Sequence, residues 1–274
     1  MMTNPELIDR AALMRNRARA RRAPELFLHH DVADETEERL EEVNRTFTDI
    51  AVVTSFPDVW HPRLPSAKII EDADVLDLTP ASHDLIIHHL CLHWANDPVG
   101  QLIQCLRALR PDGLLICTMF GGQTLHELRA ALAEAEIAET GGISPRVIPM
   151  GEMRDLGALL QRAGFALPVA DNSPRTVTYE NALRLMQDLR AMGETNALTA
   201  RHKRTPPRGL FARAAMVYTE NFGQDGRIPA TFDVVTLTGW SPHESQQKPL
   251  RPGSAVARLA EALNTEENAL TDDE

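Results

Sequence analysis

Short runs of apolar residues alternate along this chain with longer segments in which apolar residues recur every three or four positions. Runs of the first kind are typical of buried strands, and segments of the second kind are typical of amphipathic helices. The predicted strands lie near residues 50–53, 67–70, 85–89, 114–117, 165–169 and 230–240. The predicted helices lie near 5–19, 34–45, 98–109, 124–138, 153–163 and 180–192, with a last one ending near 222. Strands that alternate with helices predict an α/β fold.

Local signals place the ends of several elements. Asp97 has the residue type of a helix N-cap and Pro98 suits the first helical position, where a missing N–H costs nothing. The run Arg110–Gly113 predicts a turn from that helix into the strand 114–117. Residues 124–127 have the spacing of a capping box. The run Asn172–Pro174 is expected to separate a strand from a helix that begins near residue 180.

Length and composition indicate an ordinary globular protein. The chain has 274 residues, of which 43% are hydrophobic and 24% charged, enough for a sizeable core. It contains no run of about 18 apolar residues and no apolar signal core near its start, so we expect no transmembrane segment and a cytoplasmic location. The net charge of −11 argues against nucleic acid as a partner.

Two groups of residues invite further chemistry. A basic stretch near the start of the chain is a candidate contact for phosphates, an acidic partner or a membrane surface, the alternative being a solvated helix face. It consists of Arg15, Arg17, Arg19, Arg21 and Arg22. Three cysteines occur, and none belongs to a CxxC pair, so we interpret them as small buried hydrophobic residues. They are Cys91, Cys105 and Cys117.

Three strings in the middle of the chain resemble the class I S-adenosylmethionine-dependent methyltransferase superfamily. They are Leu92–Asp97, Leu109–Gly113 and Met119–Leu125. Within that superfamily they look most like the complex I assembly factors of the protein-arginine hydroxylase type, and more distantly like malonyl-acyl carrier protein methyltransferases. The likeness continues through 141–145, 155–157, 192–196 and 239–246, and covers about residues 69–250.

The resemblance implies a Rossmann-like fold. Its sheet would have seven mostly parallel strands with an antiparallel last strand, and the cofactor S-adenosylmethionine would lie at the carboxyl ends of the strands. A helical insert before the last strand would form a cap on the substrate side. The resemblance also implies a protein partner.

The sequence departs from the superfamily at the loop after the first strand. Class I methyltransferases place glycines there, because a side chain would block the close approach of the cofactor. This chain has Thr54–Asp58 instead, and no glycine occurs between residues 1 and 99. Phe56 and Pro57 are expected to fill or stiffen that space, which makes S-adenosylmethionine doubtful as a cofactor.

The distance along the chain gives a second, independent argument. A strand–helix–strand unit takes roughly 30 residues, whereas Ile50–Asp72 spans 23 residues. We therefore expect the fold to be truncated around the second strand. Asp72 and Ala73 fall where the superfamily has an acid followed by a small residue, the alternative being a simple turn. The candidate cofactor-binding residues are Thr54, Ser55, Asp72, Ala73, His89, His93 and Trp94.

Other polar clusters are weaker candidates. His88, His89 and His93, with Asp84 and Asp97, have the residue types of an iron site. Neighbouring strand residues point to opposite faces, however, so we predict no metal site. The pair His243–Glu244 has the residue types of an acid–base pair, with a structural role as the alternative.

These observations lead to a domain division and two hypotheses. We expect an N-terminal helical arm over 1–46, a methyltransferase-like domain over 47–250 with its insert at about 174–225, and a flexible acidic tail over 251–274. The first hypothesis is an assembly factor with an eroded S-adenosylmethionine site. The second is an active S-adenosylmethionine-dependent methyltransferase or protein-arginine hydroxylase. A cavity beside Asp72, His93 and Trp94 would favour the enzyme, and its filling by Phe56 or Trp60 would favour the assembly factor.

Overall fold

A computed structural model describes residues 6–247 of the chain, so the expected acidic tail lies outside the described residues. The chain divides into two units, Met1–Pro242 and His243–Glu274, and the fold below is that of the first. Its strands are β1 (Ile50–Thr54), β2 (Lys68–Glu71), β3 (His83–His89), β4 (Leu109–Gly121), β5 (Ala166–Tyr179) and β6 (Ile228–Trp240). Its helices are α1 (Arg10–Ala20), α2 (Phe27–Glu42), α3 (Pro98–Ala108), α4 (His126–Thr140), α5 (Met153–Ala163), α6 (Ala182–Ala191) and α7 (Arg208–Phe222).

The strands form one mixed sheet in the order β2-β1-β3-β4-β6-β5. Strands β2, β1, β3 and β4 are parallel, and β6 is antiparallel to both β4 and β5. Within residues 6–247 the sheet has six strands, not the seven that the resemblance implies. The predicted truncation is confirmed, because β1 and β2 are joined through the short 3₁₀ helix η1 (Pro57–Val59), and the described residues between β2 and β3 form no helix.

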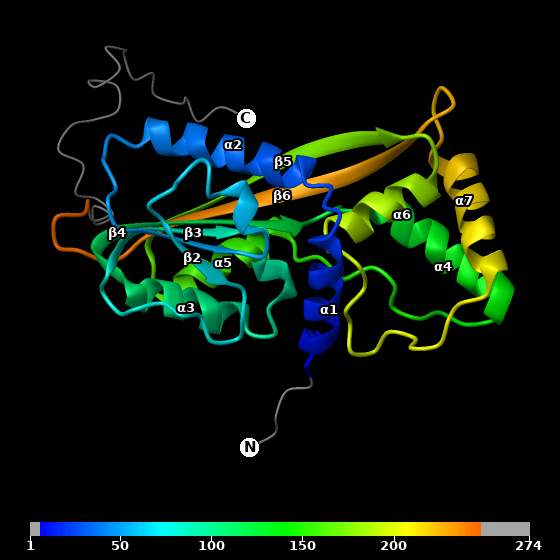
Figure 1. Cartoon of the computed structure of the whole chain (residues 1–274), viewed down its shortest axis with the longest axis horizontal. Coiled ribbons are helices and arrows are strands. Elements are labelled where there is room, and N and C mark those ends of the chain that lie inside the picture. The colour runs from blue at the N-terminus through cyan, green and yellow to red at the C-terminus, as the bar shows by residue number, and fades with distance from the viewer. Residues whose placement is uncertain (1–5, 248–274) are drawn as a thin grey trace, which may run out of the picture. The chain divides into compact units, whose positions relative to one another are not determined.

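Helices cover both faces of the sheet (Figure 1). Helices α3 and α5 pack on one face, against strand residues such as Ile86 and Leu115. Helix α2 packs on the other face, against their chain neighbours Ile87 and Leu114. The two core layers are thus made by the alternation of side chains along each strand.

A third apolar cluster lies where helices α4, α6 and α7 come together beside the ends of β5 and β6 (Figure 1). It contains Phe120 and Phe232 from the sheet and Leu128 and Leu185 from the helices. Helices α6 and α7 belong to the helical insert before the last strand. This insert therefore builds one end of the unit.

The N-terminal helices pack into the same unit. Ile8 and Leu13 are buried near Trp94 and Leu198, and a backbone bridge joins Ile8 to Leu198. Among the described residues, no helix is long and apolar enough to cross a membrane.

Asp97 and Pro98 begin α3 as predicted, and the Asp97 carboxylate accepts a hydrogen bond from the Gly100 N–H at 2.8 Å. The prediction of a turn at residues 110–113 is wrong, because β4 already begins at Leu109. Leu109 pairs with His83, and Asp112 takes a left-handed conformation inside the strand.

The prediction that residues 172–174 end the strand is also wrong, since β5 continues to Tyr179. Pro174 lies in this strand. A proline is tolerated there because β5 is an edge strand that hydrogen-bonds to β6 alone within the sheet of the described residues. The insert therefore follows Tyr179 rather than beginning near residue 174, and its first helix, α6, begins at Ala182, close to the start near residue 180 that the sequence predicts.

The capping box predicted at 124–127 does not form. Leu125, with φ of 54°, is the N-cap of α4, and its side chain makes no capping hydrogen bond. The Thr124 hydroxyl instead accepts a hydrogen bond from the Asp233 N–H at 2.9 Å, and the Glu127 carboxylate accepts one from the Thr231 hydroxyl at 2.5 Å. Both side chains bind β6, which fastens the start of α4 to the last strand.

Candidate functional site

The loop after β1 holds the first two candidate residues, Thr54 and Ser55, and both are buried. The Thr54 hydroxyl accepts a hydrogen bond from the Phe56 N–H at 3.1 Å. The Ser55 carbonyl accepts one from Arg21 Nε at 2.9 Å, and its hydroxyl lies 3.3 Å from Cys91 Sγ. Both residues are thus engaged by groups of the chain itself.

Asp72, directly after β2, is buried and faces two arginines of α1. Its carboxylate forms an ion pair with Arg17, and a second with Arg10 at 3.3 Å. Burial alone would raise the pKa of Asp72, but the positive charges of Arg17 and Arg10 lower it to about 2. Ala73 lies beside it, and its carbonyl accepts a hydrogen bond from Gln101 Nε2 at 2.8 Å.

The arginine partners of Asp72 were not predicted from the sequence. Arg17 belongs to the basic stretch near the start of the chain, and it is buried, whereas Arg15 is exposed and Arg19 is half-buried. Arg17 and Asp72 are 55 positions apart, and two opposite charges at such a separation give only a weak signal of an ion pair in one sequence.

The aromatic residues after β1 lie in the core. Phe56 and Trp60 are 4% and 0% exposed, and they pack with Val52 and Ile87. The rings of Trp60 and His89 meet edge to face with centroids 5.3 Å apart.

His89, the candidate at the end of β3, faces His29 of α2. Its Nε2 lies 3.2 Å from His29 Nδ1, within hydrogen-bond distance. Burial lowers the pKa of His29 to about 4 and that of His89 well below its usual value, so both are neutral at pH 7. The ring of His29 also meets that of Phe56, with centroids 4.8 Å apart.

The candidates His93 and Trp94 meet on the carboxylate of Glu194. Trp94 Nε1 donates to Glu194 Oε2 at 2.8 Å, and His93 Nε2 lies 3.1 Å from the same oxygen. Burial alone would raise the pKa of Glu194, but His93, Arg17 and Trp94 lower it, so the group is a carboxylate. Glu194 was not a candidate in its own right, although it lies within a string that carries the resemblance.

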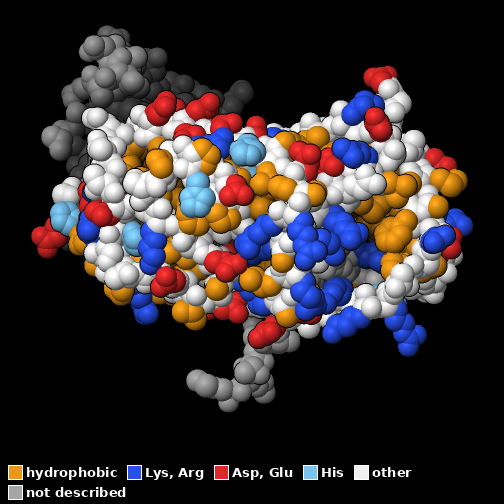
Figure 2. All heavy atoms as spheres, viewed as in Figure 1, with side chains coloured by type: hydrophobic (Ala, Val, Ile, Leu, Met, Phe, Trp, Pro, Cys, Tyr) orange, Lys and Arg blue, Asp and Glu red, His pale blue; other side chains and the backbone are white. Residues whose placement is uncertain are grey.

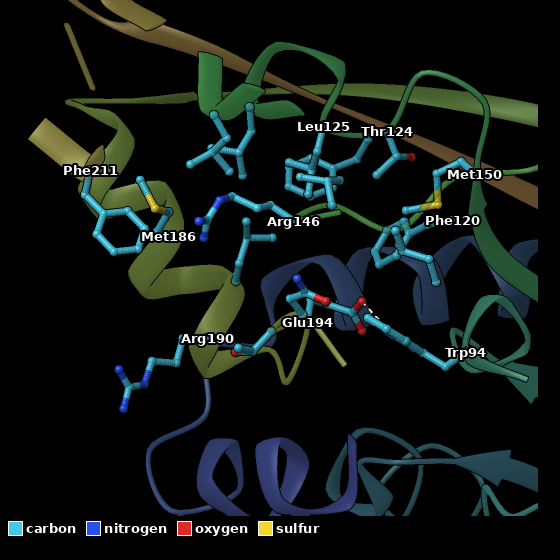
Figure 3. Close-up of a pocket in the computed structure, with 18 of the residues that line it drawn as sticks. Trp94, Phe120, Thr124, Leu125, Arg146, Met150, Met186, Arg190, Glu194 and Phe211 are labelled. Atoms are coloured by element: carbon cyan, nitrogen blue, oxygen red, sulfur yellow. Dashed lines mark hydrogen bonds between the residues drawn. The ribbon is translucent and has the colours of Figure 1, made fainter. Parts of the chain in front are cut away.

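Glu194 and Trp94 line a cavity of about 360 Å³, which we call the cap cavity (Figure 3). Its apolar wall comes from the sheet, from α4, α6 and α7, and from the loop before α5, and it consists of Phe120, Leu125, Leu128, Leu132, Val147, Ile148, Met150, Met186, Leu189, Phe211 and Phe232. Its polar lining consists of Arg19, Thr124, Arg146, Arg190, Glu194, Thr195 and Asn196. Of the candidate residues, Trp94 lines this cavity, whereas Thr54, Ser55 and Asp72 do not.

The weaker candidates are separate in space. His88 lies 3.1 Å from Gln101 Oε1 on one side of β3, whereas His89 faces His29 on the other. Within residues 6–247, no three His, Cys, Asp or Glu side chains are placed to hold a metal ion. In the second unit, His243 Nδ1 lies 2.6 Å from Ser245 Oγ. The three cysteines are free and buried, as interpreted from the sequence.

Comparisons with known proteins agree with this architecture. The model of the methyltransferase domain family matches residues 36–117, the segment that runs from α2 to β4. This chain is a member of the class I methyltransferase superfamily. Membership gives the fold, whereas the chemistry depends on the residues of the site.

Two of the similar relatives are named arginine-hydroxylase NDUFAF5, mitochondrial. The one from Danio rerio is 39% identical over 72% of this chain and 62% of its own length. The one from Homo sapiens is 40% identical over 72% of this chain and 57% of its own length. The malonyl-[acyl-carrier protein] O-methyltransferase of Xylella fastidiosa is 38% identical over 65% of this chain and 58% of its own length. The chain thus matches about three fifths of the length of these relatives.

The comparison corrects one expectation from the sequence. A cytoplasmic location was predicted from the lack of an apolar leader, and that prediction is wrong, because the relatives named arginine-hydroxylase NDUFAF5 are named as mitochondrial proteins.

Proposed function

We propose that this chain is a methyltransferase-fold assembly factor of the complex I type, which binds another protein and does not use S-adenosylmethionine. The observation that carries the proposal is the pairing of Asp72 with Arg17 and Arg10. An acid that binds the cofactor must accept hydrogen bonds from it. Here both guanidinium groups bind the same carboxylate oxygen, Oδ2, and Gln101 Nε2 lies 3.4 Å from the other oxygen, Oδ1.

The position of Phe56, shortly after β1, supports the same proposal. A side-chain carbon added at Gly193 would lie 3.3 Å from the Phe56 ring and 3.2 Å from the Arg17 side chain. Phe56, Arg17 and residue 193 therefore meet at one point near the end of β1. The residues present do not fit a cofactor that enters this space, because a buried ion pair and an aromatic ring would have to leave it together.

The test is a titration of S-adenosylmethionine and S-adenosylhomocysteine into the purified chain, followed by calorimetry and by thermal unfolding. A methyltransferase known to bind the cofactor serves as the control in the same buffer. We expect no heat and no rise in unfolding temperature at millimolar ligand. Micromolar binding, which corresponds to about −8 kcal/mol, would overturn the proposal.

The assembly role has its own test. Deleting the gene in its source organism is expected to lower the amount of fully assembled complex I on a native gel and to leave subcomplexes. The intact chain, supplied on a plasmid, is expected to restore the complex. An unchanged level of assembled complex in the deletion strain would contradict the assembly role.

A second candidate function is that of a protein-arginine hydroxylase. It is supported by the names of the relatives and by the Glu194 carboxylate in the lining of the cap cavity, which has the charge to receive a guanidinium group. Incubation with a peptide of the partner in the presence of dioxygen and a two-electron reductant, which reduces the second oxygen atom to water, followed by mass spectrometry, tests it. A gain of one oxygen on an arginine would favour this candidate over the first.

A further inference from the structure

The cap cavity combines a continuous apolar wall with an excess of positive charge. Its charged lining residues are Arg19, Arg146, Arg190 and Glu194, that is, three cations and one anion. Its volume of about 360 Å³ lies in the range of small-molecule sites. Charged groups at an apolar pocket fix the orientation of a ligand and select its charge.

The charge of Arg19 meets only neutral hydrogen-bond partners. Its Nη2 donates to Asn16 Oδ1 at 3.0 Å and lies 3.4 Å from Thr195 Oγ1, and both of these partners are neutral. Its Nε is buried and lacks a hydrogen-bond partner among the described residues. Burial and the nearby charge of Arg190 lower the pKa of Arg19. Two guanidinium groups thus repel each other at the cavity.

Neither Arg19 nor Arg190 forms an ion pair with an acidic side chain in the described part of the chain. Arg190 is exposed and points outward from the cavity in Figure 3. The surface over α1 carries a group of Lys and Arg side chains in Figure 2, so the positive charge extends outward from the cavity. An anion that approaches from solvent would meet this surface first.

Arg146 brings a third cation to the apolar wall. Its guanidinium points toward Met186 in Figure 3, and its Nη2 forms an ion pair with Glu136 at 2.6 Å. Its Nε is buried without a hydrogen-bond partner among the described residues. Burial of such a donor without a partner costs free energy, which a ligand acceptor would recover.

Glu194 does not neutralise these arginines. Its Oε2 is held by Trp94 Nε1 and His93 Nε2, and the charge of the buried Arg17 acts on the same carboxylate. The excess positive charge therefore remains available to a ligand.

We propose that the cap cavity binds an amphiphile that has one apolar chain and an anionic head, either a carboxylate or a phosphate. The chain would lie against Phe120, Leu128 and Met186, and the head would bind Arg19 and Arg190. This site does not depend on the proposed assembly role or on the absence of S-adenosylmethionine.

The test is a calorimetric titration of the full chain with three probes of equal chain length, decanoate, decyl phosphate and decylamine. We expect both anions to bind at least about tenfold more tightly than the amine. Tighter binding of decanoate than of decyl phosphate would indicate a free fatty acid as the source of the head, and the reverse order would indicate a phospholipid head. Equal binding of all three, tighter binding of decylamine, or no binding of either anion would overturn the proposal.

Substitutions locate the site. Arg190→Gln and Arg19→Gln are each expected to weaken decanoate binding about tenfold, whereas Arg184→Gln, an exposed arginine of the same helix α6 outside the lining, should leave it unchanged. Met186→Trp should abolish binding of all anionic chains by filling the cavity. Thermal unfolding of each variant identifies any that does not fold, and Arg190→Gln keeps the test decisive because its exposed side chain supports no packing. Undiminished binding to Arg190→Gln and Met186→Trp would contradict the assignment.

Discussion

Arg17, near the end of α1, forms a buried ion pair with Asp72, the first residue after β2. The two side chains are 4% and 0% exposed, and the residues are 55 positions apart in the sequence. Arg10 of the same helix donates to the Asp72 carbonyl at 2.7 Å. Helix α1 is therefore fastened by its charges to the carboxyl end of β2, at the place where the superfamily positions its acid.

Removing one member of this pair should destabilise the fold strongly. Arg17→Met leaves the Asp72 carboxylate buried beside a single remaining cation, and we expect a loss of about 3–5 kcal/mol in the free energy of unfolding. Chemical denaturation measures it. Arg110→Gln is the control, because the Arg110–Asp49 pair is about half exposed and such pairs contribute at most about 1 kcal/mol. Similar losses in both variants would contradict a buried, structural role for Arg17.

The histidine pair His29–His89 predicts acid sensitivity. The folded pKa of His29 is about 4, below the unfolded value near 6.5, so the unfolded chain binds a proton first as the pH falls. Stability should be intact above about pH 6.5 and decrease from there toward pH 4, by about 3 kcal/mol for His29. Asp72, whose folded pKa is also lowered, adds a second loss that begins below its unfolded pKa and continues toward pH 2.

The predicted loss of stability is tested by measuring the free energy of unfolding from pH 8 to pH 4. The double variant His29→Phe/His89→Leu removes both buried imidazoles and should have a shallower slope between pH 6.5 and pH 4. His61→Gln, a change at an exposed histidine, should keep the slope of the unchanged protein. An identical slope in the double variant and the control would show that the pair does not carry the effect.

The three cysteines should be inert in the folded protein. Burial raises the pKa of Cys91 and of Cys105 to about 12, and that of Cys117 well above its usual value. Since the thiolate is the reactive form, we expect almost no reaction with a thiol reagent at pH 8. In guanidinium chloride all three thiols should react. Fast labelling of one thiol under native conditions would mean that its segment opens locally.

The sequence predicted the strands and the order of the elements because apolar periodicity is a local property. The predictions fail where residues that are distant in the sequence determine the local structure. The Thr124 hydroxyl and the Glu127 carboxylate have the spacing of a capping box, but both bind β6, more than 100 residues away. Pro174 looks like the end of a strand, yet it lies in an edge strand that tolerates it.

The candidate site could be predicted from the sequence in part. The missing glycines after β1 and the short distance to Asp72 are visible along the chain, and so is the polar pair His93–Trp94. The partners of these residues are not visible, because Arg17, His29 and Glu194 come from segments that only the fold brings near. An ion pair or a hydrogen bond between distant residues leaves no periodic signal in one sequence.

Two glycines with positive φ allow the cost of backbone strain to be measured apart from the cost of steric overlap. Gly122 has φ of +51°, and a side-chain carbon added there would lie 2.4 Å from Asp233 Oδ2, the oxygen that accepts the Gln123 N–H at 2.7 Å. Gly141, the C-cap of α4, has φ of +73° with no described atom within 4 Å of an added carbon. We expect Gly141→Ala to cost about 1 kcal/mol from strain alone. Gly122→Ala should cost about 3 kcal/mol, because strain is joined by displacement of a hydrogen-bonded carboxylate. Denaturant unfolding of the two variants measures the difference, and equal losses would mean that Asp233 moves aside freely and does not hold the turn after β4.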